Sequence, residues 1–354
     1  MHILLTGASG LIGGELAGLL AARGHAVTAL LHHATGIRRN DGSAVPTEPW
    51  TQAPRPGAVA VLSGSVSKPL LGLDAQHYDT LRDGLDLIVH LAAVTAFDAR
   101  PALLRAVNVG GTATILALAT GGARPVPLLH VSTAYVCGEV SGEVAEQDAP
   151  GAGAFANGYE ASKAEAEALV QQARRDGLPV VIARPSIVVG AHADGAIGRT
   201  DGVYALIRLV AEGRVQALPV ADHASLDLVP IDHVTGGLLH LAERMEQAAG
   251  YTIHLVSGDP VPVAVLFGLG AHYPHFAAPR LVPPEQFDAT RLTPFGQVLH
   301  RQVTMHYASY LRRDPRFLDD GLRALGGSGC PPTDAAFLRR LVDRCIVTGY
   351  LRAA

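Results

Sequence analysis

Short apolar runs alternate with longer segments of mixed polarity along the first half of the chain, as at residues 3–5 and 180–183. Short apolar runs bounded by turn residues are typical of buried strands, whereas the longer segments carry apolar residues at helical spacing. Strands that alternate with helices predict a parallel sheet covered on both faces. The predicted strands are residues 2–5, 26–31, 59–62, 85–92, 128–132, 180–184, 224–229 and 252–256.

The clearest helical pattern is at residues 11–23, where leucines lie on one side and Gly24 ends the segment. Residues 34–57 contain many turn residues and no apolar period, so we predict a loop there. The predicted helices are residues 11–23, 101–120, 159–175, 203–212, 297–311 and 334–350.

Composition narrows the possible functions. The 354-residue chain has a net charge of −4 at pH 7 and no basic block, so we expect no nucleic-acid partner. Cys137, Cys330 and Cys345 are too scattered for a disulfide framework or a zinc site. We find no apolar stretch long enough to span a membrane, and the strand at the N-terminus leaves no room for a signal peptide. We therefore expect a cytoplasmic protein without a metal, whose oligomeric state composition does not determine.

A glycine-rich turn follows the first predicted strand directly and opens the first helix. Gly7, Gly10 and Gly13 have the spacing of a dinucleotide-binding turn. The first glycine permits a tight turn, the second lets the backbone approach a pyrophosphate, and the third lets the helix pack closely on the sheet. Backbone N–H groups at the helix start then face the phosphates. The predicted cofactor-binding residues of this turn are Thr6, Gly7, Ser9, Gly10, Leu11, Ile12 and Gly13.

The second strand is followed by cations rather than by a carboxylate. An NAD site usually has an acidic residue about 20 positions after the turn, which binds the ribose 2′-hydroxyl. Residues 16–40 contain no Asp or Glu, while His32, Arg38 and Arg39 follow the strand. These cations favour a 2′-phosphate and therefore NADPH over NADH. The alternative is that both arginines are solvated loop charges.

The sheet and its glycine turn indicate an α/β fold of the Rossmann type, with a doubly wound parallel sheet and a smaller, mostly helical substrate-side lobe. After Pro185 the alternation becomes irregular. We predict a dinucleotide-binding core of residues 1–185 and 228–257, and a substrate-binding lobe of residues 186–227 and 258–354.

Tyr159 and Lys163 are four residues apart and therefore share one face of a predicted helix. A free tyrosine has a pKa near 10 and is a poor acid–base group at neutral pH. A nearby ammonium stabilises the phenolate and lowers the pKa, so Lys163 is expected to activate Tyr159. The alternative is an amphipathic helix with two solvated residues.

The strand at residues 128–132 ends with hydroxyl side chains at the carboxyl edge of the predicted sheet, where such sheets bind ligands. Ser132 and Thr133 are candidates to orient a substrate oxygen toward Tyr159. Each could instead bond to local backbone.

Several motifs in order resemble the extended short-chain dehydrogenases/reductases over residues 1–260. These motifs lie at residues 6–13, 90–93, 108–112, 130–136 and 159–163. Residues 130–136, 159–163, 183–187 and 227–232 look like the thioester reductase and fatty acyl reductase branch. That branch reduces acyl groups held on coenzyme A or on the phosphopantetheine arm of a carrier protein.

The resemblance implies roles for individual residues. Thr133, Tyr159 and Lys163 match the catalytic triad, and Asn108 matches an asparagine that supports a relay water or simply bonds to backbone. Ser65 replaces an aspartate that often contacts adenine in the family. Further cofactor contacts are implied at Ser65, Val66, Leu91, Ala92, Ala93, Lys163, Pro185 and Ile187.

The expected activity is NADPH-dependent reduction of an acyl thioester, either a small molecule or tethered to a carrier protein, to an aldehyde and possibly on to a primary alcohol. One alternative is an NADP-dependent ketone or secondary-alcohol oxidoreductase of the same fold. A second alternative is a non-catalytic dinucleotide sensor, because a fold alone does not fix a function.

Overall fold

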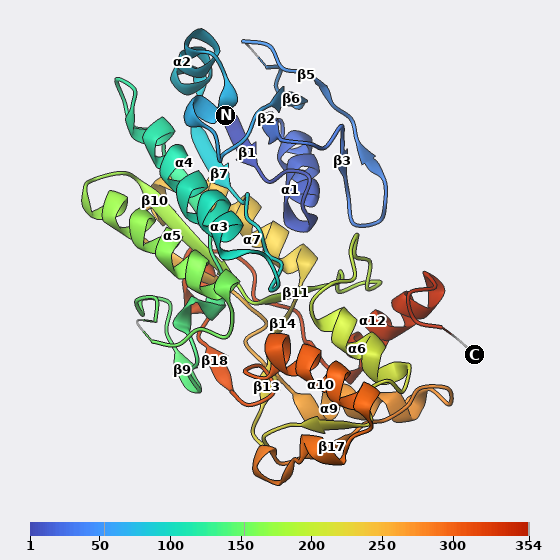
Figure 1. The fold of residues 1–354 in the computed structure, drawn as a ribbon. Coiled ribbons are helices and arrows are strands. Elements are labelled where there is room, and N and C mark those ends of the chain that lie inside the picture. The colour runs from blue at the N-terminus through green and yellow to red at the C-terminus, as the bar shows by residue number, and fades with distance from the viewer. Residues whose placement is uncertain (53, 152, 353–354) are drawn as a thin grey trace.

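The central sheet has eight strands, and all its neighbouring strands run parallel (Figure 1). From edge to edge they are β15 (Thr252–Leu255), β10 (Val180–Pro185), β8 (Leu128–Val131), β7 (Leu87–His90), β1 (His2–Thr6), β2 (Ala26–Leu31), β6 (Val59–Ser63) and β5 (Glu48–Pro49). The chain order reverses between β1 and β7, which is the switch point of a doubly wound sheet. The predicted fold class is confirmed. This computed structural model describes residues 1–52, 54–151 and 153–352, and only the backbone of residues 302, 304 and 305.

Helices cover both faces of the sheet because its strands are apolar on both sides, and Figure 1 shows α4 and α5 together on one of them. One face carries α1 (Leu11–Ala22), α7 (Ile231–Glu243) and α8 (Met245–Ala248). The other carries η1 (Pro69–Gly72), α2 (Ala75–Gly84), α3 (Pro101–Leu104), the π-helical segment η2 (Arg105–Val109), α4 (Gly110–Thr120) and α5 (Gly158–Arg175).

The predicted helix at residues 101–120 consists of α3, η2 and α4 in succession. By length and hydropathy, Pro101–Thr120 passes a test for membrane-spanning helices that core helices of other proteins also pass. Here Gly111, Ile115 and Leu118 are buried on the inner side of α4, which packs against α5. The segment therefore serves as a layer of the fold in this structure, and the test is weak evidence for a span.

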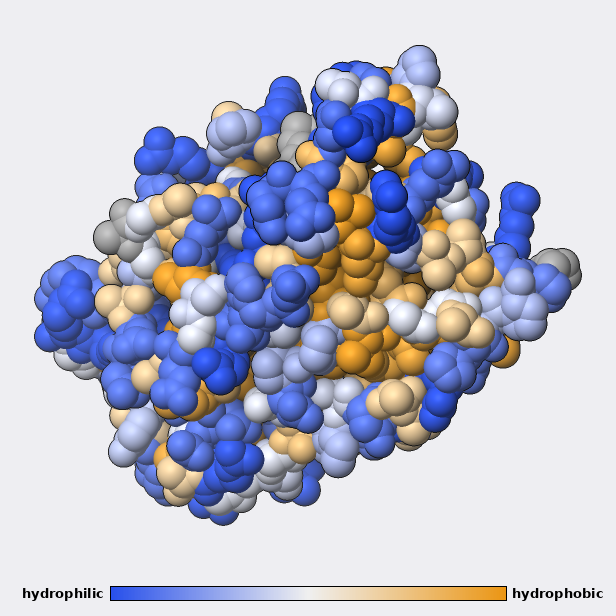
Figure 2. Space-filling view, turned by 90° about the horizontal axis from the view of Figure 1, so that it is seen from below, coloured by the Kyte–Doolittle hydropathy of each residue, from blue (hydrophilic) through white to orange (hydrophobic). Residues whose placement is uncertain are grey.

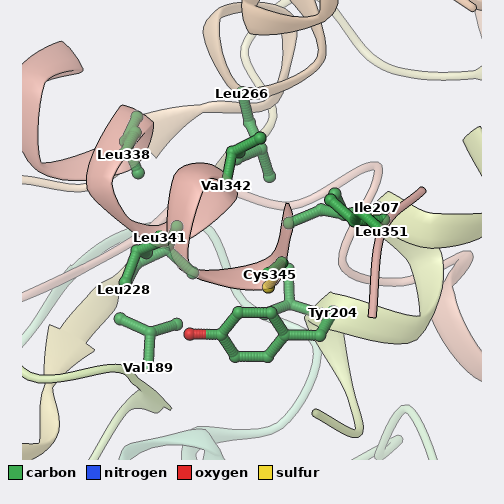
Figure 3. A pocket seen from close by; sticks show the side chains of 11 residues that line it. Val189, Tyr204, Ile207, Leu228, Leu266, Leu338, Leu341, Val342, Cys345 and Leu351 are labelled. Carbon is green, nitrogen blue, oxygen red and sulfur yellow. The ribbon is translucent and has the colours of Figure 1, made fainter. Parts of the chain in front are cut away.

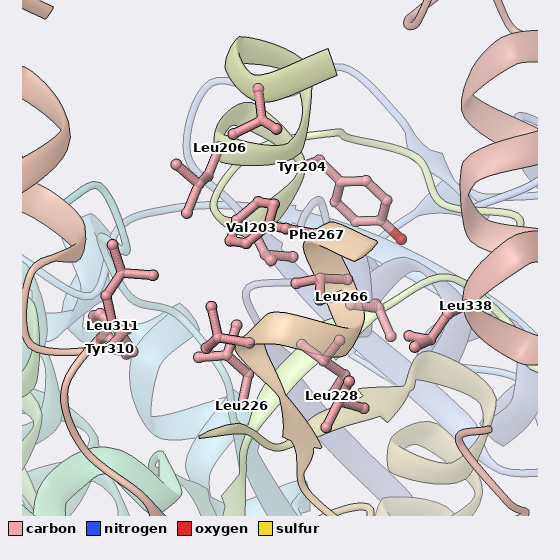
Figure 4. Packing of buried hydrophobic residues seen from close by; sticks show 14 of the residues in the cluster. Val203, Tyr204, Leu206, Leu226, Leu228, Leu266, Phe267, Tyr310, Leu311 and Leu338 are labelled. Atoms are coloured by element: carbon pink, nitrogen blue, oxygen red, sulfur yellow. The ribbon is translucent and has the colours of Figure 1, made fainter. Parts of the chain in front are cut away.

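A second hydrophobic core lies below the sheet in the view of Figure 1. Figure 4 shows Val203 and Leu206 of one helix packed near Phe267 of another and Leu226 of a strand. The elements of this region are α6 (Val203–Ala211), β12 (Ala217–Pro219), β13 (Ser225–Leu226), β16 (Val261–Pro262), α9 (Val263–Gly268), η4 (Leu269–His272), β17 (Arg280–Val282), η5 (Pro284–Gln286), η6 (Ala289–Arg291), α10 (Pro294–Tyr307) and α12 (Ala335–Val347).

Several short elements connect the two cores. They are η3 (Ala134–Cys137), β9 (Gly142–Val144), β11 (Ile187–Val189), β14 (Leu228–Pro230), β18 (Pro315–Phe317) and α11 (Asp320–Ala324). β18 pairs with β9, and Leu322 of α11 packs into the core against the sheet. The division of the chain at residues 185, 227 and 257 stays a prediction, and these contacts cross it.

The structure differs from the predicted elements in several places. The predicted loop at residues 34–57 contains β3 (Ile37–Arg38), β4 (Ala44–Val45) and β5, of which β3 and β4 form a small hairpin. The predicted strand at 224–229 is split into β13 and β14, which pair with different strands. The helices α2 and α7 were not predicted.

Candidate functional site

The glycine turn leaves no room for side chains. Gly7 has φ +73°, and a Cβ there would lie 2.8 Å from the backbone nitrogen of Ala92. A Cβ on Gly13 would lie 2.1 Å from the carbonyl oxygen of Gly7. α1 begins after Gly10 without a side-chain cap, so the N–H groups of its first turn are available to an anion. The turn therefore fits a dinucleotide pyrophosphate, and it includes the predicted residues Thr6, Ser9, Leu11 and Ile12.

A buried chain of hydrogen bonds supports the turn from beneath. The Thr6 hydroxyl accepts a bond from the backbone N–H of Ala92 (3.2 Å) and lies 2.7 Å from Nδ1 of His90. Because the Thr112 hydroxyl donates to the carbonyl of Asn108 (2.7 Å), it must accept from His90, and a neutral His90 then accepts from Thr6 at Nδ1. Nε2 of His90 then donates to Thr112 Oγ1 (3.2 Å). Burial lowers the pKa of His90 to about 3, so the imidazole is neutral. The sequence analysis assigned His90 no role, although it precedes the predicted contacts Leu91, Ala92 and Ala93.

The cations after β2 are not all placed near the turn. The Arg39 guanidinium lies beside Gly18, two turns into α1, and is 3.8 Å from Glu15. Arg38 is exposed and donates to the carbonyl of Gly42 in its own hairpin (3.1 Å). The structure thus does not bring Arg39 to the start of α1, because Glu15 holds it along the flank of that helix.

Lys68 is a cation near the end of β2 that the sequence analysis missed. Desolvation, the neighbouring His33 and Lys68 together lower the pKa of His32, so Lys68 lies within electrostatic range of that ring. Both His32 and Lys68 are exposed. The position of Lys68 could not be predicted from local sequence, because it depends on the pairing of β6 with β2, which brings residues after β6 next to those after β2.

Ser65 and Val66 follow β6 and are buried. The Ser65 hydroxyl lies 2.9 Å from the hydroxyl of Ser67, and Val66 packs against Gly111 of α4. Ser65 is therefore partly engaged by its own loop, and its contact with adenine stays a prediction.

The predicted catalytic residues Thr133 and Tyr159 do meet. Thr133 follows β8, Tyr159 lies in the first turn of α5, and the Thr133 hydroxyl lies near enough to the phenol to lower its pKa. The Thr133 hydroxyl also donates to the carbonyl of Pro185 (3.3 Å), a predicted cofactor contact that ends β10. Three elements that are distant in sequence thus converge at the carboxyl edge of the sheet. Ile187 follows on β11, which pairs with β14 rather than with the central sheet.

The expected activation of Tyr159 by Lys163 is not found. Burial, followed by the charge of Glu160, raises the pKa of Tyr159 to about 12, while the nearby Thr133 hydroxyl acts in the opposite direction. Lys163 donates instead to the carbonyl of Val131 (2.8 Å). Burial lowers the pKa of Lys163 to about 8, against the opposing charge of Glu167. In this structure desolvation of the phenol outweighs the influence of the ammonium, so the activation of Tyr159 by Lys163 stays a prediction.

Asn108 is buried in the π-helical turn and bonds to two segments. Its amide pairs with the backbone of Val94, accepting from N–H at 2.7 Å and donating to C=O at 3.0 Å. It also donates to the hydroxyl of Ser162 (2.8 Å), which donates to the Tyr159 carbonyl (2.8 Å). The backbone-bonding alternative therefore describes its contacts, and a relay role stays a prediction.

Aromatic rings from distant segments surround Tyr159. The ring of Phe97 is 6.3 Å from that of Tyr159 and 5.8 Å from that of Tyr310, on which it is stacked. Tyr307 of α10 is 6.2 Å from Phe97. The sequence analysis gave Phe97 no role, because a single aromatic residue in a loop has no pattern.

The lower region contains apolar hollows. Figure 2 shows apolar side chains gathered in a central hollow on the face seen from below. Figure 3 shows a pocket in which the Tyr204 hydroxyl points toward Val189 and Cys345 lies beside the ring. Its void of about 10 Å³ admits roughly one water. An acyl chain therefore does not fit into this pocket as it stands.

The described residues contain no group of three or more His, Cys, Asp or Glu side chains that could hold a metal ion. Burial raises the pKa of Cys137 to about 11, so its thiol is protonated at neutral pH. Asp227 is buried and accepts bonds from Ser186 and from Ser257 Oγ (2.9 Å), which gives it a structural role in a loop.

Comparison with known proteins agrees with this geometry. The sequence model of the NAD-binding Male sterility protein family matches residues 5–237. The isonitrile lipopeptide synthase of Streptomyces coeruleorubidus is 28% identical over 99% of this chain, which spans about a quarter (25%) of that relative. A 4-hydroxy-2-methyl-3-oxo-4-farnesyl-3,4-dihydroquinoline-1-oxide ketoreductase of Stigmatella aurantiaca is 34% identical over 54% of this chain and 51% of its own length.

Among solved structures, the terminal R domain from the myxalamid PKS-NRPS biosynthetic pathway matches with a TM-score of 0.82 and 29% identity, over 99% of this chain and 92% of that domain. The matched family model covers more than half of the chain and includes the glycine turn, Thr133, Tyr159 and Lys163. The chain therefore belongs to the NAD-binding Male sterility protein family, in the thioester reductase and fatty acyl reductase-like branch of the NAD(P)-dependent extended short-chain dehydrogenases/reductases.

Proposed function

We propose that this chain reduces an acyl thioester to an aldehyde with NADPH, and that Thr133, Tyr159 and Lys163 form its catalytic triad. The observation that carries the proposal is the convergence of Thr133 after β8, Tyr159 at the start of α5 and Pro185 at the end of β10, at the carboxyl edge of the sheet. The likeness to an R domain over 99% of the chain supports the thioester as substrate.

A bound reduced nicotinamide supplies a hydride to the carbonyl carbon, and the chain's own residues act on the oxygen. Thr133 and Tyr159 donate hydrogen bonds to that oxygen, where negative charge develops. Tyr159 is suited to be the acid, since its raised pKa keeps it protonated at neutral pH. The resulting hemithioacetal loses its hydroxyl proton, its C–S bond breaks, and aldehyde and thiol leave. A second round would give the primary alcohol.

Two exposed cations and one imidazole support NADPH rather than NADH as the cofactor. Lys68 lies within electrostatic range of His32 at the end of β2, where a ribose 2′-phosphate would lie, and Arg38 is exposed in the hairpin that follows. Arg39 is no longer needed for this part of the proposal, since Glu15 holds it along α1.

The substrate is proposed to be an acyl group tethered to a carrier protein in the cytoplasm. Two of the proteins that match 99% of this chain are an isonitrile lipopeptide synthase and an R domain of a PKS-NRPS pathway. The branch that the motifs resemble reduces thioesters on carriers or on coenzyme A, and the shared thioester carbonyl fits both.

A ketone reductase is the second candidate, and one observation favours it. The ketoreductase of Stigmatella aurantiaca is 34% identical to this chain, compared with 28% for the synthase and 29% for the R domain, although its match covers only 54% of this chain. The same triad would serve, because both reactions place a carbonyl oxygen near Tyr159. A cofactor sensor is disfavoured because Thr133, Tyr159 and Lys163 are all retained.

The test is NADPH oxidation with an acyl-CoA, an acyl-pantetheine, a carrier-bound acyl thioester and a panel of ketones. We expect turnover with the thioesters and release of free thiol. Tyr159→Phe should lower kcat by about a hundred-fold or more while NADPH still binds. Turnover of ketones alone would favour the second candidate, and unchanged turnover in Tyr159→Phe would refute Tyr159 as the acid.

A further inference from the structure

A carboxylate lies next to the proposed acid in the chain. Glu160 follows Tyr159 in the first turn of α5 and is fully buried. One carboxylate oxygen accepts a bond from Arg313 (2.7 Å), and the other accepts from the backbone N–H of Ala156 (3.0 Å). The Tyr310 hydroxyl donates to the first oxygen as well (2.5 Å). Among the residues whose side chains the structure describes, Arg313 is the only cation that bonds to this carboxylate.

Arg313 comes from the other end of the chain and is itself buried. It lies between α10 and β18 and donates to the carbonyl of Gly138 (2.6 Å). Its guanidinium lies 4.6 Å from the ring centre of Tyr310 and 4.8 Å from that of Tyr135. The planar cation is thus enclosed by two aromatic faces and one ion pair, a geometry that favours arginine over lysine.

The backbone around Arg313 is fixed to the same region. Asp314, the next residue, accepts a bond from Ser225, and its carbonyl accepts from the N–H of Gly142 (2.8 Å). β18 then continues as a parallel partner of β9. Arg313 is therefore held in place by backbone pairing and not only by its own side chain.

The charge of Glu160 bears directly on Tyr159. After burial, it is the next largest influence that raises the pKa of the phenol. Loss of the Arg313 charge would leave a buried carboxylate uncompensated beside a group that must release a proton. Tyr310 also stacks on Phe97, whose ring is 6.3 Å from that of Tyr159, so the C-terminal segment is linked to Tyr159 through Phe97 as well as through Glu160.

We propose that Arg313 is a positioning residue for the reductive site: its ion pair with Glu160 compensates the carboxylate beside Tyr159 and fixes the first turn of α5. This proposal rests on the proposed function, because it assigns Arg313 a role through Tyr159. It also gives a role to the C-terminal segment, which lies outside the residues matched by the family model.

Other ionisable groups also face this region. They are Lys163 and Glu167 on α5, Tyr135 and Cys137 on η3, Tyr310 and Tyr307 of the C-terminal segment, and Asp227 before β14. Glu160 influences Tyr159 but is not among the groups that shift Lys163, which responds to Glu167. Changes at Glu160 and Arg313 should therefore act mainly on the phenol.

The test measures kcat/KM for the thioester against pH at saturating NADPH in four variants. Arg313→Met should lower kcat/KM about ten-fold at neutral pH. It should also move the upper alkaline limb of the profile, which belongs to the Tyr159 phenol and lies above that of Lys163, up by about one pH unit, because an unbalanced negative charge favours the protonated phenol. Glu160→Gln should move the limb down by a similar amount. Glu160→Gln/Arg313→Met should return it near the wild-type position. Arg313→Lys should keep the limb but recover only part of kcat, with KM for NADPH unchanged.

The matched control is Arg23→Met, which removes an exposed arginine paired with Glu243 at 2.9 Å and should shift nothing. A merely structural role predicts lower activity without limb shifts of opposite sign, and that result would overturn the proposal. If Arg313→Met does not fold, the direction in which Glu160→Gln moves the alkaline limb decides between the two roles. An activity-independent titration of tyrosinate absorbance, compared with Glu160→Gln/Tyr159→Phe, should show a lowered phenol pKa in Glu160→Gln even if thioesters prove not to be substrates.

Discussion

Lys163 is a buried cation whose ionisation is coupled to folding. Burial lowers its pKa from 10.5 to about 8. Between these values the unfolded chain binds a proton that the folded chain has released, so the free energy of unfolding rises with pH in this window. Relative to Lys163→Met, the wild type should gain about 3 kcal/mol between pH 8 and pH 10.5. Urea unfolding of both proteins at the two ends of the window measures this difference.

For each protein the free energy of unfolding changes with pH at a certain slope. The difference between the slopes of the wild type and Lys163→Met reports on Lys163, because the other ionisable groups are common to both proteins. It does not depend on the bond to the Val131 carbonyl, whose loss changes stability by an amount that is similar at each pH. Equal slopes would show that Lys163 keeps its ordinary pKa in the folded protein.

Lys68 is the residue on which we expect cofactor selectivity to depend. It is exposed and close to His32 at the end of β2, so its positive charge would attract a 2′-phosphate bound there. Lys68→Ala should weaken NADPH binding by about 1 kcal/mol, roughly five-fold, and leave NADH binding unchanged. Fluorescence titration with both cofactors measures this. Arg39→Ala is the matched control and should not change the NADPH/NADH ratio; equal loss for both cofactors in Lys68→Ala would contradict the placement.

At the scale of elements, the start of α1 has the least tolerance for added volume. A Cβ on Gly13 would lie 2.1 Å from a backbone oxygen that cannot move without opening the turn. Gly13→Ala should lower the free energy of unfolding by about 1 to 3 kcal/mol and weaken NADPH binding about ten-fold. Chemical denaturation and cofactor titration measure the two effects.

Gly236 provides the contrasting position on a helix. It is exposed on α7, and a Cβ there would have no atom within 4 Å. Gly236→Ala should therefore stabilise the protein by up to about 1 kcal/mol, through helix propensity alone. Similar effects of the two substitutions would mean that Gly13 is not under steric constraint.

Most strands of the sheet could be predicted because burial on both faces makes them continuous apolar runs. The helix α2 could not, since only Tyr78 and Leu81 are buried and its pattern is polar. In α7 the adjacent Gly236 and Gly237 interrupt an otherwise apolar helix and indicate a break that does not occur. Packing against α1 supports this helix where its local propensity is weak.

The residues of the candidate site also fall into two groups, those that local sequence predicts and those that depend on long-range contacts. Thr133, Tyr159 and Lys163 were predictable because local spacing places them at strand ends and on one helix face. The cofactor contact of Arg39 stays a prediction, and its ion pair with Glu15 could not be foreseen because Glu15 lies on another element. Arg313 had no detectable signal, because its contact with Glu160 spans 153 positions of the chain.

At the scale of the molecule, the C-terminal segment closes back onto the dinucleotide-binding half. β18 pairs with β9, and α11 packs on β15 at the edge of the central sheet. Phe317 of β18 is buried between Tyr135 (5.4 Å), which belongs to the lower core, and His254 (5.5 Å), which lies on β15 of the central sheet. These contacts indicate that the two cores unfold together.

Phe317→Ala tests this coupling. Loss of a buried ring should lower the free energy of unfolding by about 3 to 5 kcal/mol. Because Phe317 connects both cores, we expect one calorimetric transition at a lower temperature, with NADPH stabilising the whole of it. Phe295→Ala removes a ring that is 68% exposed on α10 and should change stability by less than about 0.5 kcal/mol. A separate early transition that leaves NADPH binding intact would show that the C-terminal segment is an independent unit, and the dependence of Tyr159 on Arg313 would then be lost at a lower temperature than cofactor binding.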